Sequence, residues 1–425
     1  MTNPAPRAPR DLRVRRALEI LPATPELEPF VELLVASSVA DPGRRWSASG
    51  ELGSVGDRLV DARALERGAG RVAAEEARHT ERLLRRTAVV VGALARDDHD
   101  AILDALLEQG AEEEELGRAS RARAWYRAGV GLAREWGHPR TPEALRRAAR
   151  AARNSGELEE AATAYEEAWA AARELGLEDD AIIAATGRGN VEVDHGRWHE
   201  AEGWYRRALE VVGEEGPPRR ERWQLHQNLA IVRRRLGDLE GARRRLELAR
   251  AEGEALDDPD ARVEVSNGMG QLLLAEGDPA GAEALFRAAL EEASTPKARV
   301  TIGVNLGEAL LARGRDLEAG EVAREAEAVA LARGVHVKLP ELYRLLAAVA
   351  MHRGEQDGYL LLERALEVIR ARRLPPWEEA QTLRALARAA AERGEDERAH
   401  ELEARAGELL GEESITQGDA NGEGE

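Results

Sequence analysis

The sequence predicts an all-α fold, a solenoid of about eight helix-turn-helix repeats, from three observations. A glycine in a polar turn recurs at intervals of 37 to 41 residues. A small residue follows most of these glycines by five positions, and apolar residues then return at helical spacing, as in Ala201, Trp204 and Tyr205. A fixed period in this range is typical of solenoids, in which each repeat buries its apolar face only against its neighbours. The marker glycines are Gly117, Gly156, Gly196, Gly237, Gly277, Gly314, Gly354 and Gly394.

The segment before the repeats predicts a separate helical part. Residues 1–10 are rich in Pro and Arg and are expected to be disordered. Residues 11–96 are expected to form an N-terminal helical segment that could cap the array. Within it, Thr24-Pro25-Glu26 fits a helix N-terminus, and Asp41-Pro42-Gly43 a helix stop.

The repeat array is expected over residues 98–411. Each repeat should hold a first helix of about 14 residues, a glycine turn, and a second helix of about 16 to 18. Glycine just past a helix end suits the left-handed conformation, and Asp238 or Asp278 in the next position suits the start of the second helix. Residues 412–425 hold acidic residues and no cation, which predicts a solvated acidic tail.

These hairpins resemble the tetratricopeptide repeat family. First helices carry an apolar–small pair, as in Met269-Gly270 and Leu306-Gly307. Second helices carry an alanine with an aromatic four positions later, as in Ala122/Tyr126, Ala161/Tyr165, Ala201/Tyr205 and Ala282/Phe286. The stride near 40 departs from the usual 34 and resembles bacterial members with extended repeats. The resemblance implies a right-handed α-solenoid whose first helices line a concave face that binds proteins or peptides.

Polar side chains fall at the positions that this arrangement would turn into a groove. Amides can pair with a peptide backbone, and arginine can bind a carboxylate through two hydrogen bonds. The alternative is that exposed helix positions are simply polar. The peptide-groove candidates are Arg146, Arg150, Asn190, Gln227, Arg234, Asn267 and Gln271, with Arg235, Glu308 and Arg344 in the same register.

Composition limits the function further. The formal charge of −19 argues against nucleic acid and anionic membranes as partners, although Arg233–Arg235 and Arg243–Arg245 form a local basic patch. The chain has no Cys, so disulfides and thiolate metal sites are excluded. No secretory signal or apolar span is recognised, which predicts a cytoplasmic protein.

Catalytic and metal chemistry find little support in the sequence. His195 and His199 have metal-ligand spacing, but Gly196 between them predicts a turn that separates them. No cofactor is expected, and the sequence favours a non-enzymatic scaffold or adapter that binds a protein or peptide. The alternative is a peptide-sensing regulator in signalling or transcription that acts through residues 11–96.

Overall fold

The computed structural model describes residues 98–410 except 356, together with residues 82, 83, 86, 89, 90 and 93. The predicted disordered start (1–10), nearly all of the predicted N-terminal helical segment (11–96) and the predicted acidic tail (412–425) lie outside the described residues. The chain divides into two compact units, residues 1–176 and residues 177–425. Each unit is considered by itself below.

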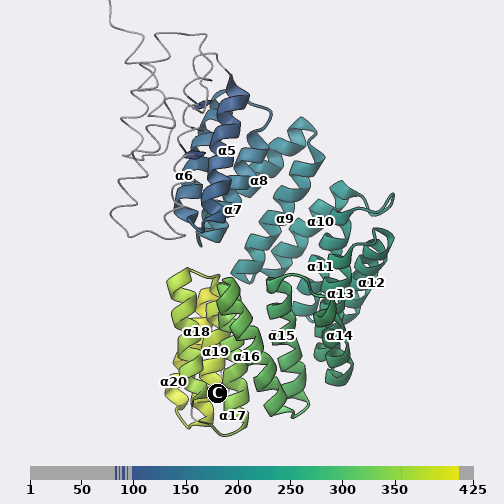
Figure 1. Cartoon of the computed structure of the whole chain (residues 1–425), viewed down its shortest axis with the longest axis vertical. Coiled ribbons are helices and arrows are strands. Elements are labelled where there is room, and N and C mark those ends of the chain that lie inside the picture. The colour runs from purple at the N-terminus through teal and green to yellow at the C-terminus, as the bar shows by residue number, and fades with distance from the viewer. Residues whose placement is uncertain are drawn as a thin grey trace, which may run out of the picture. The chain divides into compact units, whose positions relative to one another are not determined.

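The described residues are helical, and consecutive helices pair as hairpins (Figure 1). Unit 1 holds α5 (His99–Glu115), α6 (Ala119–Glu135), α7 (Thr141–Asn154) and α8 (Leu158–Leu175). Unit 2 holds six hairpins and one short 3-10 helix. They are α9 (Glu178–His195), α10 (Trp198–Val212), α11 (Arg220–Arg235), α12 (Leu239–Ala255), α13 (Pro259–Ala275), α14 (Pro279–Glu292), α15 (Pro296–Ala312), α16 (Asp316–Arg333), η1 (His336–Lys338), α17 (Leu339–His352), α18 (Gly358–Arg372), α19 (Pro376–Glu392) and α20 (Asp396–Leu410).

The turn glycines explain where the helices end. All eight marker glycines have a positive φ, between 70° and 83° at Gly117, Gly156 and Gly237 for example, a conformation that a Cβ would penalise. The next helix then begins with a cap, because the Asp238 carboxylate accepts the Gly241 N–H at 2.8 Å. The predicted hairpins and their turns are confirmed. Their first helices are mostly longer than predicted, with 16 to 18 residues in α9, α11, α13, α15 and α19.

Small residues on first helices let second helices pack closely. A Cβ placed on Gly270 of α13 would lie 2.5 Å from Cε1 of Phe286 in α14, and Gly189 and Tyr205 stand in the same relation. Ala282 and Phe286 are fully buried. The aromatic ring therefore fills the space that the missing side chain leaves, as the repeat pattern predicts.

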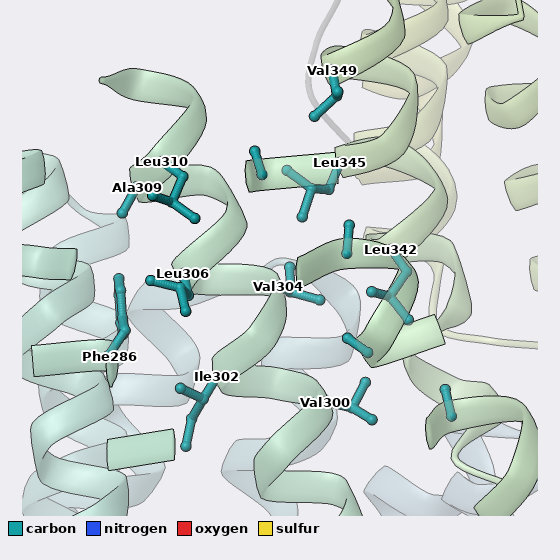
Figure 2. Close-up of a cluster of buried hydrophobic side chains, with 14 of the residues drawn as sticks. Phe286, Val300, Ile302, Val304, Leu306, Ala309, Leu310, Leu342, Leu345 and Val349 are labelled. Carbon is teal, nitrogen blue, oxygen red and sulfur yellow. The ribbon is translucent and has the colours of Figure 1, made fainter. Parts of the chain in front are cut away.

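The first helices in the middle of unit 2 are buried on two sides. Ile302 and Leu306 of α15 lie on the side of the helix that faces Phe286, while Val300 and Val304 lie on the side of Leu342 in α17 (Figure 2). One continuous hydrophobic cluster therefore runs from α13 to α18. Burial of this kind, shared between neighbouring hairpins, is the main source of stability in a repeat fold.

One feature of unit 2 differs from the predicted solenoid. Hairpins pack on their neighbours in chain order, but α9 also packs against α19, so the first hairpin of the unit contacts the last. The small rotation between successive hairpins accumulates along the unit, and after six hairpins it brings distant helices together. The prediction that each repeat packs only on its neighbours is therefore wrong at this place.

Candidate functional site

The first helices of unit 2 form one connected layer. Each of α9, α11, α13, α15 and α17 contacts the first helix of the next hairpin, and α19, in the last hairpin, contacts α9. We call these six helices the inner layer. The same helices carry the polar side chains that the sequence predicts for a groove.

A chain of hydrogen bonds joins three neighbouring helices of the inner layer. Arg234 Nη2 on α11 donates to Gln271 Oε1 on α13 at 3.1 Å, and Gln271 Nε2 donates to Asn305 Oδ1 on α15 at 3.2 Å. Asn305 Nδ2 donates to Asn267 Oδ1 at 2.7 Å. We call these four side chains the amide chain. The bonds fix the orientation of each amide group, so the donors and acceptors that remain point in defined directions.

Gln227 on α11 also bonds across to α13, and it is nearly as deeply buried as Asn305 of the amide chain. Its Nε2 donates to the Glu264 carbonyl oxygen on α13 at 2.9 Å, and its side chain is 6% exposed. Its Oε1 is buried and has no hydrogen-bond partner among the described residues. The structure thus brings Gln227, Arg234, Asn267 and Gln271 together on α11 and α13.

Charged side chains flank the amide chain. Arg235 follows Arg234 at the end of α11, and Glu308 lies one helical turn after Asn305 on α15. Among the described residues, none of Arg234, Arg235 and Glu308 has an oppositely charged partner within ion-pairing distance. Further along the layer the charges are paired, since Arg344 contacts Glu378 at 2.9 Å.

The protein around these three charges shifts their pKa values. Burial lowers the pKa of Arg234 to about 10, and the adjacent Arg235 lowers it further in the same direction. Burial also lowers the pKa of Arg235 and raises the pKa of Glu308. Arg235 and Glu308 are nevertheless exposed, so water still solvates part of each charge. Each would gain from an oppositely charged partner.

Two tryptophans connect the ends of unit 2. Trp198 at the start of α10 and Trp377 at the start of α19 pack edge to face with ring centroids 4.7 Å apart. The Arg235 guanidinium lies 4.9 Å from the Trp377 ring centroid and 5.7 Å from that of Trp198. Leu410 at the end of α20 lies against Gly196. We call Trp198, Trp377 and Arg235 the aromatic joint, and it places Arg235 beside the amide chain.

The remaining groove candidates have local partners. Arg150 on α7 of unit 1 pairs with Glu114 at 2.6 Å, and the same carboxylate accepts the Tyr126 hydroxyl at 2.7 Å. Arg146 lies one turn earlier on α7 and is half-buried. Asn190 on α9 accepts the Tyr205 hydroxyl within its own hairpin at 2.7 Å.

Sequence reasoning missed Asn305 and Trp377. Asn305 lies 38 residues after Asn267 while their turn glycines, Gly277 and Gly314, are 37 apart, so counting back from the glycine places Val304, and not Asn305, at the position of Asn267. No local signal marks Trp377, whose partner belongs to a hairpin far away in the sequence.

The histidine pair does not share a helix. His195 is the last residue of α9, Gly196 has a φ of 76°, and His199 lies in the first turn of α10, as the turn prediction requires. In the described part of the chain, no group of three or more His, Asp or Glu residues could hold a metal ion. No helix there has both the length and the apolar character of a membrane span.

Known structures share this architecture. No family model matches the chain, and no curated protein matches its sequence. A Rap protein complexed with competence and sporulation factor aligns with 96% of this chain and 99% of its own, at 13% identity and a TM-score of 0.53. A tetratricopeptide repeat protein from Parabacteroides merdae covers 63% of this chain and 93% of its own, at 16% identity and a TM-score of 0.47. A thermophilic TPR protein from Thermus thermophilus covers 49% of this chain and 99% of its own, at 22% identity and a TM-score of 0.36.

Identities this low speak for the fold alone. Together with the glycine turns and the packing of small residues against aromatic rings, the alignment with the Rap protein shows a fold of stacked helix-turn-helix repeats, as the sequence predicts.

Proposed function

We propose that this protein is a non-enzymatic interaction module that holds a peptide or a helix of a partner protein against the inner layer of unit 2. The observation that supports this most is the amide chain with Arg234 at its end. Amide groups held in fixed directions can pair with the backbone of a guest peptide without first losing rotational freedom. The Rap protein that shares this fold was solved in complex with competence and sporulation factor, which supports binding by such an array.

The experiment is affinity capture with the full chain, followed by a binding measurement on the partner that is identified. The test variant combines Arg234→Gln with Gln271→Ala, which removes one end and one link of the amide chain. The control variant is Arg244→Gln, because Arg244 is an exposed residue of α12 whose contact is Glu240 on its own helix. Loss of a hydrogen bond to a charged group should weaken binding by roughly tenfold or more.

Three outcomes decide the matter. Weaker binding by the test variant alone supports the inner layer as the binding surface. Equal binding by all three proteins, with unchanged helicity by circular dichroism, places the partner elsewhere. Equal loss in the control variant points to a general charge effect instead.

A second function, peptide sensing that regulates signalling or transcription through residues 11–96, is supported by the fold shared with the Rap protein over almost the whole chain. It predicts that the full-length protein, with its captured peptide, changes the activity of a second partner. A transcriptional role requires a specific mobility shift of DNA by the full-length protein. If the captured peptide changes neither the activity of a second partner nor DNA binding, peptide sensing is wrong and the function as an interaction module stands.

A further inference from the structure

Ion pairing is the rule on this molecule, and the neighbourhood of the amide chain departs from it. Glu283 of α14, for example, contacts Arg287, Arg313 and Arg315. An exposed charge needs no such partner, because water solvates it. Within the described ranges, Arg234, Arg235 and Glu308 have no such pair, and their placement distinguishes them from other exposed charges: Arg234 is half-buried and bonded to Gln271, and Arg235 lies against two tryptophan rings.

The surrounding contacts hold these three groups in place. Arg234 is bonded to Gln271, and Gln271 to Asn305, one turn before Glu308. Arg235 is placed by the faces of two tryptophan rings, which attract a cation without neutralising it. Arg234 and Arg235 on α11 and Glu308 on α15 therefore lie on opposite sides of α13. They are close enough to interact electrostatically but are not in contact.

We propose that Arg234, Arg235 and Glu308 form a dipolar recognition site, which takes a peptide segment with neighbouring acidic and basic side chains. The inference rests on the proposed function and gives its guest a chemical class. The acidic side chain of the guest pairs with the two guanidiniums, and arginine suits a carboxylate because two N–H groups can bind both oxygens. The basic side chain pairs with Glu308, and the amide chain between them meets the peptide backbone.

A guest peptide with only acidic or only basic side chains would not suit this site. A purely acidic guest would satisfy the arginines but would be repelled by Glu308, which already feels Glu341. A purely basic guest would face the opposite problem. Repulsion of the wrong charge provides specificity in addition to the attraction.

The test is selection of displayed short random peptides on the full-length protein, repeated on three variants. The variants are Arg234→Gln with Arg235→Gln, Glu308→Gln, and the control Arg244→Gln. Wild type and control should enrich peptides with an acidic residue beside a basic one. The arginine variant should lose the preference for the acid, and Glu308→Gln the preference for the base. A peptide selected on wild type should bind each site variant at least about tenfold more weakly, and its affinity should fall with added salt.

The possible failures are distinct. If wild type enriches no peptide at all, the proposed function fails and the dipolar site falls with it. If peptides are enriched but carry no such charge pair, or if Glu308→Gln selects the same sequences as wild type, the dipolar site is wrong while peptide binding stands. Circular dichroism of each variant separates lost recognition from lost folding, and Arg234→Lys with Arg235→Lys serves if the glutamine variant unfolds. The lysine variant keeps the charges and should retain the acidic preference at reduced affinity.

Discussion

The aromatic joint should contribute measurably to the stability of unit 2. The change is Trp198→Ala, Trp377→Ala and the double variant. The rings pack edge to face at 4.7 Å, and such pairs contribute about 0.5 to 1.5 kcal/mol beyond the area they bury. Arg235 lies against both rings, and each cation–π contact at a partly solvated place adds about 0.5 to 1 kcal/mol. Together with the lost burial, Trp377→Ala should lower the free energy of unfolding by about 2 to 3 kcal/mol.

The assay is urea unfolding of the four proteins in a double-mutant cycle. The coupling free energy between Trp198 and Trp377 should be about 1 kcal/mol, because either substitution alone already breaks the contact. Trp136→Ala is the control, since Trp136 stacks on His99 within unit 1 and should not couple to Trp377. A coupling free energy near zero between Trp198 and Trp377 would refute their contact, and with it the contact between the first and last hairpins of unit 2.

Two further predictions concern packing and protonation. Gly270→Ala should destabilise the fold by about 1 to 3 kcal/mol, because the added Cβ overlaps Phe286, and Phe286→Leu should relieve part of that loss in thermal unfolding. A Gly270→Ala protein as stable as wild type contradicts the close packing. Burial, with the neighbouring Arg245, lowers the pKa of His226 to about 4, so the histidine is neutral in the fold and its ring accepts a hydrogen bond from Arg245. The unfolded chain then binds a proton that the fold does not, and stability should fall as the pH drops from about 6.5 to about 4, by up to about 3 kcal/mol. Urea unfolding at several pH values in this range should show that the free energy of unfolding changes less with pH in His226→Gln than in wild type. An equal pH dependence in the two proteins would contradict the neutral histidine.

Much of the candidate site follows from periodicity. Arg234, Asn267 and Gln271 could be placed on first helices because each lies at a fixed distance before a turn glycine. Their partners could not be inferred this way. A side chain on a first helix can bond within its hairpin, as Asn190 does with Tyr205, or across hairpins, as Asn267 does with Asn305. The choice depends on distances between helices, which a repeat pattern does not encode.

The repeating hairpin can be predicted from the amino-acid sequence alone. Glycines that can adopt a positive φ end the first helices, and pairs such as Gly270 and Phe286 set how closely two helices approach, so these features depend on residues near each other in the chain. The contact of α9 with α19, and the position of Arg235 against Trp198 and Trp377, follow only from the folded chain. The reason is that no residue pattern within a single repeat reveals the small rotation between successive hairpins. The rotations add up over the six hairpins, and their sum determines which distant surfaces come into contact.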